Sequence, residues 1–270
     1  MSLDQSAAEF EYDRDTRVDK RDDGEFTATL TDGWTTFTTH PNGGYVLGTA
    51  LNALGQTLSQ PDPLVASAFF LRPAAPGSAD IRTRVLREGR RTATGETVLE
   101  QGGKEIVRAT ATYGDLAPDP SARVLSLEGP PRLPAPEDCP VLPEFDRPEG
   151  VSIAHRVHYR FPQRPRWMDG HKDGRPHNEF WMRFADGRQA DTGSLAAMVD
   201  FAIPAVLEIG EFGTITVELT VHVRARPAPG WLACRVYTKH VAGGLHEEDM
   251  EIWDSQGALV AQARQLAMLL

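Results

Sequence analysis

Residues 215–226 read Ile-Thr-Val-Glu-Leu-Thr-Val-His-Val-Arg-Ala-Arg, the clearest structural pattern in the chain. Apolar and polar side chains alternate through all twelve positions. This period of two is typical of a β-strand with one buried face. The stretch therefore predicts a long strand in a sheet that is covered on one side.

The Arg-Pro pair that follows this pattern has an earlier counterpart. Two sequence features recur at an offset of 154 positions: the dipeptide Arg72-Pro73 returns as Arg226-Pro227, and Gly103 returns as Gly257. A short, mostly apolar helix is expected ahead of each pair of recurring positions, at residues 43–54 and 195–207. A repeat of this length indicates a duplicated domain rather than a solenoid unit.

Each copy is expected to contain a strand, a buried helix and four further strands. In the first copy the strand-like runs are residues 26–30, 65–72, 79–88, 92–101 and 105–113. In the second they are residues 152–161, 179–184, 215–226, 231–238, 245–253 and 258–269, so two runs rather than one precede the helix. The second helix is apolar apart from Asp200, and such a helix must be surrounded by protein. The predicted fold is α+β, with two curved antiparallel sheets, each wrapped around a central helix.

Composition shifts suggest the boundaries between these units. Residues 1–24 are charged and weakly patterned, so we expect a poorly ordered lead-in. Residues 115–150 hold nine of the twenty prolines, a density that excludes a helix or a central strand. We therefore expect a first unit at 25–114, a proline-rich linker at 115–150 and a second unit at 151–270.

Overall composition excludes several classes of function. A net charge of −10 argues against a nucleic-acid partner, which requires a basic face. The two cysteines, Cys139 and Cys234, do not predict a disulfide framework. The charged N-terminus does not resemble a secretory signal, and no apolar run approaches the roughly 18 residues that span a bilayer. The cytoplasm is the expected location.

The second copy carries polar residues that the first mostly lacks. At the same offset, Asp200 and Gln265 correspond to Val46 and Ala111, and Thr216 corresponds to Asp62. Asp62 lies between two prolines and is expected to be a solvated turn residue. A duplicated fold with a polar cluster in one half predicts one working site per chain.

Each polar candidate also has a structural interpretation. Asp200 could face solvent at the open end of its helix, and Gln265 could bond to the backbone of a neighbouring strand. Thr216 could be an ordinary strand residue, and Thr220, on the same face, is an alternative to it. A buried carboxylate or amide without partners is costly, so a cleft with hydrogen-bonding groups is the functional reading.

The first helix begins with Gly43-Gly44. Bare N–H groups at a helix N-terminus can stabilise a carbonyl oxygen that gains negative charge. Glycine there could equally serve close packing of the helix on the sheet. The eight histidines lack metal-ligand spacing, and His171 and His177 have no third ligand nearby in sequence, so no metal or other cofactor is expected.

Together these motifs resemble the acyl-CoA thioesterase II family of double-hotdog enzymes. The matching stretches are Phe70-Leu71-Arg72-Pro73, Val85 to Arg90, Met198-Val199-Asp200-Phe201, Thr216 to Thr220, and Gly257 to Ala261 leading to Gln265. They span residues 25 to 269 in the order of the family. The resemblance implies a tandem hotdog fold and a hydrolase of lipid metabolism.

The resemblance also implies site residues and partners. Asp200, Thr216 and Gln265 fall where the family holds and activates a water, and Gly43, Gly44 and Tyr45 would supply backbone amides to the carbonyl. The substrate would be acyl-CoA or another acyl thioester, and the chain a homo-oligomer, at least dimeric. A non-catalytic acyl or acyl-CoA binding protein and a hotdog dehydratase remain the alternatives.

Overall fold

The computed structural model describes residues 9–36, 39–117, 119, 121, 123–142 and 151–270. The first half contains α1 (Glu11–Asp15), β1 (Val18–Asp22), β2 (Glu25–Leu30), η1 (Asp32–Trp34), α2 (Gly43–Gly55), β3 (Asp62–Phe70), β4 (Gly77–Glu88), β5 (Ala93–Gln101) and β6 (Lys104–Gly114). The second half contains η2 (Ser152–His155), β7 (Val157–Arg160), η3 (Arg166–Asp169), β8 (His177–Phe184), α4 (Thr192–Met198), η4 (Ala205–Ile209), β9 (Thr214–Val223), β10 (Leu232–Tyr237), β11 (Val241–Ala242), β12 (Leu245–Trp253) and β13 (Leu259–Leu269).

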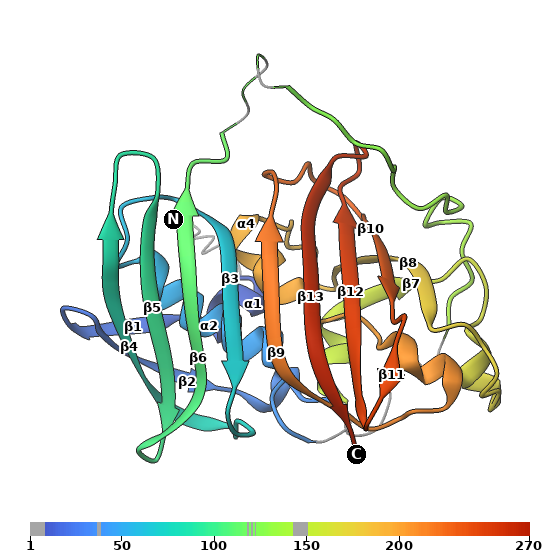
Figure 1. Cartoon of the computed structure of the whole chain (residues 1–270), viewed down its shortest axis with the longest axis horizontal. Helices are drawn as coiled ribbons and strands as arrows, with labels where there is room; N and C mark the ends of the chain where they lie inside the picture. Colours follow the sequence, from blue (N-terminus) through green and yellow to red (C-terminus); the bar gives the residue numbers. More distant parts are fainter. Residues whose placement is uncertain (1–8, 37–38, 118, 120, 122, 143–150) are drawn as a thin grey trace, which may run out of the picture.

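One antiparallel sheet runs through both halves (Figure 1). Its strand order is β1-β2-β4-β5-β6-β3-β9-β13-β12-β10-β8-β7, with β11 paired to β12. Strands β3 and β9 form the seam between the halves, with Val65 opposite His222 and Phe69 opposite Glu218. The prediction of two separate sheets is therefore corrected, because the edge of one half hydrogen-bonds to the edge of the other.

The two helices pack against each other on the inner face of this sheet. Helix α2 begins where it was predicted, and its buried residues contact the strands of the first half. Glycine lets α2 approach α4 closely, because a Cβ at Gly44 would lie 2.3 Å from the backbone oxygen of Ala197. The region between the helices therefore has no space for a larger side chain at Gly44.

The second helix is shorter than predicted. Helix α4 ends at Met198, and a separate 3-10 helix, η4, starts at Ala205. Pro204 lacks the N–H that a continuous helix needs and restricts the residue before it. Asp200 therefore lies in the turn after α4 rather than on a helix, which corrects the predicted helix at 195–207.

The N-terminal residues from Phe10 onward are ordered, contrary to expectation. Helix α1 and strand β1 pack against α2, and Tyr12 is buried there. Its ring packs against Trp34, Phe184 and Phe201 with centroid distances of 5.6, 5.2 and 6.4 Å. Aromatic burial of this kind outweighs the charge pattern that suggested disorder. Residues 1–8 lie outside the described part of the lead-in.

Asp62 ties the two halves together and is not a solvated turn residue. Its carboxylate is buried and accepts hydrogen bonds from Arg226 (2.8 Å), Thr192 (2.8 Å) and the Leu116 amide (2.8 Å). Burial alone would raise the pKa of Asp62, but these hydrogen bonds hold it below its usual value. The turn reading is wrong because its partners come from distant parts of the sequence.

The structure also bears on the predicted strand at 152–161, the linker and the cysteines. The strand predicted at 152–161 is confined to β7, since η2 occupies its first residues. The described residues between 115 and 142 form no helix or strand, and the linker from 143 to 150 lies outside the described residues. Cys139 and Cys234 are both free and buried. Where the structure describes the chain, it contains no helix long and apolar enough to cross a membrane.

Candidate active site

A β-bulge on β9 turns Thr216 toward the inner face of the sheet. Opposite β13, Glu218 pairs with Leu266, but Thr216 pairs with Ala267. Val217 is thus the extra residue of the bulge, and the alternation of the strand reverses beyond it. Regular alternation would have left Thr216 on the outer face. The bulge brings it to the face that contains the helices.

Three side chains form a hydrogen-bonded line on this inner face, which we call the polar row: Thr216, Gln265 and Glu248. The Thr216 hydroxyl donates to Gln265 Oε1 (2.9 Å), and Gln265 Nε2 donates to Glu248 Oε1 (2.9 Å). The other carboxylate oxygen of Glu248 accepts from the Ala205 amide at the start of η4 (2.7 Å). Thr216 and Gln265 are partly accessible, whereas Glu248 is only 5% exposed.

Asp200 is held at the N-terminus of α2. Its Oδ2 accepts from the Gly44 amide (2.7 Å) and from Asn42 Nδ2 (3.1 Å). Asn42 also donates to the backbone oxygen of Asp200 (2.9 Å), so the first half fixes both the turn and the carboxylate. A carboxylate at this position is stabilised by the helix dipole and the free amides.

The backbone amides predicted to be bare are partly engaged. Gly44 N–H bonds to Asp200, and Tyr45 N–H bonds to the capping oxygen of Asn42 (3.1 Å). The expectation of free amides at Gly44 and Tyr45 is therefore wrong for this state of the molecule. Gly43 remains partly accessible next to the carboxylate, since a Cβ there would lie 3.0 Å from Asp200 Oδ2.

The carboxylates of Asp200 and Glu248 both have pKa values near neutral pH. Although Asp200 is partly accessible, protein atoms crowd its carboxylate, and this desolvation raises its pKa to about 6 against the opposing hydrogen bonds from Gly44 and Asn42. Burial, together with the negative charges of Asp200 and Asp249, raises the pKa of Glu248 to about 7 against the hydrogen bonds from Ala205 and Gln265. Because the two charges interact, we expect them to titrate as a pair.

The structure thus places the predicted residues in two groups, Asp200 with Gly44 and Thr216 with Gln265, and adds Glu248 to the second. Among the described hydrogen bonds none joins Asp200 directly to the polar row, and the charge interaction with Glu248 links them. Thr220 lies on the outer face, bonded to Ser67 (2.9 Å) and Glu218 (2.6 Å), so Thr216 is the threonine beside Gln265.

Glu248 was missed in the sequence. It lies in a run rich in charged residues, 245–253, where an acidic side chain seemed unremarkable. The available signal was its phase, because Glu248 alternates with Met250 and Ile252, which are both buried. A carboxylate in phase with apolar strand residues indicates a buried, partnered group.

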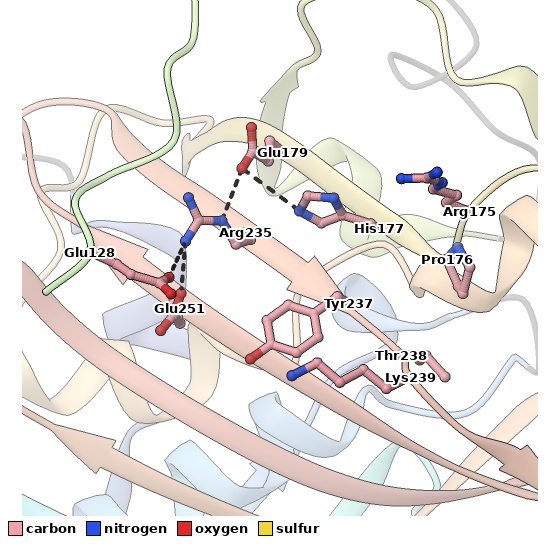
Figure 2. Close-up of a pocket in the computed structure, with 10 residues that line it drawn as sticks. All are labelled: Glu128, Arg175, Pro176, His177, Glu179, Arg235, Tyr237, Thr238, Lys239 and Glu251. Atoms are coloured by element: carbon pink, nitrogen blue, oxygen red, sulfur yellow. Dashed lines mark hydrogen bonds and ion pairs between the residues drawn. The ribbon is translucent and has the colours of Figure 1, made fainter.

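A hollow of about 600 Å³ lies elsewhere, on the outer face of β8, β10 and β12 (Figure 2). Arg235 crosses it and is neutralised by Glu179 (2.9 Å), Glu251 (3.2 Å) and Glu128 (3.5 Å). This hollow has mixed charge and does not contain the Asp200 site. Among the described residues no group of three or more histidine, cysteine or acidic side chains could hold a metal ion.

Comparison with known protein families identifies relatives of both halves. Residues 30–114 match the acyl-CoA thioesterase N-terminal domain, and residues 136–269 match the acyl-CoA thioesterase C-terminal domain. An uncharacterized protein of Mycobacterium tuberculosis is 30% identical over 247 residues, which cover 82% of this chain and 80% of that protein.

Solved structures show the same architecture. A protein from Thermobifida fusca assigned as a thioesterase II superposes with a TM-score of 0.87 at 30% identity, covering 97% of this chain and 98% of that chain. A protein of unknown function with a hotdog fold from Alicyclobacillus acidocaldarius has a TM-score of 0.82 at 24% identity, covering 96% and 97%. The second likeness shows the fold alone.

Proposed function

Because the chain belongs to the acyl-CoA thioesterase family, we propose that it hydrolyses acyl-CoA thioesters to a free acid and CoA. We further propose that its two halves are hotdog units that share one sheet, with one active site built from both. The observation that carries the proposal is the position of Asp200. Its carboxylate has a pKa of about 6, is held at a helix N-terminus and interacts electrostatically with Glu248 of the polar row.

The polar row defines how a water would bind. The proton of the Thr216 hydroxyl is donated to Gln265, so Thr216 Oγ1 can only accept a further hydrogen bond. Both described hydrogen bonds to the Asp200 side chain end on Oδ2, which leaves Oδ1 as the acceptor for the reaction. A water that donates one proton to Thr216 and the other to Asp200 directs a lone pair at the substrate.

Hydrolysis then follows as general-base catalysis. The water oxygen bonds to the thioester carbonyl carbon while its proton passes to Asp200. The tetrahedral intermediate collapses, the carbon–sulfur bond breaks, and the thiolate leaves and is protonated by solvent or by Asp200. A base with a pKa near the working pH typically contributes roughly a hundred- to ten-thousandfold in rate.

The N-terminus of α2 is the proposed site for the developing oxyanion. Gly43 is accessible there, and Gly44 donates to Asp200 while that carboxylate is charged. Once Asp200 has taken the proton, its oxygen is a weaker acceptor. The Gly44 amide then becomes available to the oxyanion at the stage when negative charge appears on the substrate.

We also propose that the protein is a homo-oligomer, at least dimeric. The outer face of the sheet exposes apolar side chains on neighbouring strands, among them Phe69 (52%), Ile215 (40%) and Met268 (42%). Apolar groups that cluster on a sheet surface are often covered by a second copy. Light scattering at micromolar concentration tests this, and a mass equal to the 29.7 kDa chain would contradict it.

The function is tested by measuring thiol release from a panel of acyl-CoA esters of increasing chain length, with acyl carrier protein thioesters in parallel. We expect hydrolysis of at least part of the panel and its loss in Asp200→Asn. Binding of acyl-CoA without release of thiol, under conditions where a control thioesterase is active, would contradict the proposal and favour a binding protein.

A further inference from the structure

Glu248 connects the site to the rest of the second half. From the middle of β12 it reaches β13 through Gln265 and the start of η4 through Ala205. The N-terminus of η4 is five residues beyond Asp200, so one buried carboxylate is bonded both to Gln265 and to the end of the segment that carries the proposed base. Neither contact is accounted for by the proposed hydrolysis alone.

The chemistry of a carboxylate gives this contact a direction. An ionised carboxylate only accepts hydrogen bonds, so Gln265 must present its NH₂ group to Glu248. The amide oxygen of Gln265 then faces Thr216, and the Thr216 hydroxyl must donate to it. The orientation of the hydroxyl is thereby fixed two side chains away from Glu248.

We propose that Glu248 is a positioning residue, which orients the Gln265 amide and so makes Thr216 an acceptor for the reacting water. This inference rests on the proposed function. Without the charge on Glu248 the side-chain amide of Gln265 could rotate so that its oxygen and NH₂ group exchange places. Thr216 would then accept from Gln265 and point its proton at the water. The water would bind with its lone pair toward Thr216 instead of toward the thioester carbon.

The surroundings of Glu248 make its charge dependent on pH. The charged groups that act on it are Asp200, in the turn after α4, and Asp249, its neighbour on β12. From β13 and η4 it meets the neutral amides of Gln265 and Ala205, and burial lowers the pKa of His246, the next inward residue on β12. No cation compensates Glu248 among these contacts, so we expect its ionisation to follow that of Asp200 as pH rises.

The test is a pair of substitutions that exchange the amide and the carboxylate. In Glu248→Gln the new amide oxygen must accept from the Ala205 N–H, so its NH₂ group faces Gln265. The hydrogen bonds of the polar row then reverse their donor–acceptor direction. In the double variant Glu248→Gln with Gln265→Glu, a carboxylate at 265 accepts from both neighbours, and the Thr216 hydroxyl donates again. The double variant also preserves the net charge of the site.

We expect kcat of Glu248→Gln to fall roughly a hundredfold with KM little changed, because misorientation rather than binding is affected. The pH–rate profile should also lose its upper apparent pKa. The double variant should exceed Glu248→Gln in kcat at least tenfold. Should Glu248→Gln fail to fold, Gln265→Glu takes its place in the comparison with the double variant and should be exceeded by the same factor.

The matched control is Asp249→Asn. It removes a carboxylate from the adjacent position of the same strand, but Asp249 bonds to Arg264 (2.6 Å) instead of the polar row, and its activity should stay near that of the wild type. A wild type that does not cleave acyl thioesters overturns the proposed function and this inference with it. An active wild type with an equally active Glu248→Gln, or a double variant no better than the singles, overturns the inference alone.

Discussion

Asp200→Asn should lower activity and raise stability at the same time. Both described hydrogen bonds to the side chain end on Oδ2, so an asparagine can place its oxygen there and keep the bonds from Gly44 and Asn42. Its NH₂ group then occupies the position of Oδ1 and cannot take a proton from water. We expect a loss of roughly a hundredfold or more in kcat at pH 7.5, with the fold preserved.

The gain in stability follows from the raised pKa. Burial shifts the pKa of Asp200 from 3.8 to about 6, so folding favours the protonated form. The contribution of Asp200 to stability is therefore full below pH 4 and is lost as pH rises through about 6. The difference between a pKa of 3.8 and one of about 6 corresponds to roughly 3 kcal/mol, and we expect the free energy of unfolding of Asp200→Asn to exceed that of the wild type by about 2–3 kcal/mol at pH 8.

Urea unfolding of both proteins between pH 3.5 and pH 8 measures this difference. Asp62→Asn is the matched control with the opposite sign, because the pKa of Asp62 is lowered and its contribution is lost as pH falls. If the free energies of unfolding of Asp200→Asn and the wild type ran parallel across this pH range, the raised pKa of Asp200 would be refuted. Full activity of the variant would refute Asp200 as the base.

Three further outcomes are expected. Thr216→Val should lose about ten- to a hundredfold in kcat, whereas Thr220→Val, on the outer face, should keep wild-type activity in the same thiol-release assay. Asp62→Asn should remain active, but its free energy of unfolding in urea at pH 7 should fall by about 2 kcal/mol. The substitution weakens the ion pair between the buried Asp62 and Arg226, whose side chain is 43% exposed. Gly44→Ala should lose activity and about 1–3 kcal/mol of stability, because its Cβ would lie 2.3 Å from a backbone oxygen, while Gly55→Ala, with its nearest contact at 3.5 Å, should show wild-type activity and thermal unfolding.

The alternation of apolar and polar residues, with the positions of glycine and proline, was sufficient to predict most of the helices and strands. The alternation at 215–226 and the glycines before α2 locate a strand and a helix that the structure contains. The predicted helix at 195–207 was too long, because the many apolar residues there obscured the helix-breaking effect of Pro204. The seam between β3 and β9 could not be read from either strand alone, since edge pairing depends on the partner surface.

The candidate site was predictable in part for the same reason. Asp200 and Gln265 stand out as polar residues in apolar surroundings, and the structure places both on the inner side of the sheet. The orientation of Thr216 was beyond the pattern, because a bulge shifts the alternation without any mark in composition. Glu248 was overlooked because its burial depends on which face of β12 meets the helices.

The seam strand β3 has a consequence for how the protein loses its structure. Each half contributes one edge of the seam, and Asp62, at the start of β3, also anchors Arg226 and Thr192 from the other half. Melting either half alone would strip the other of a strand partner and uncover the facing helix, so we expect heat to unfold the protein in one calorimetric transition. An isolated half would retain a bare strand edge next to an uncovered helix, and the surface that best fits that combination is another copy of itself.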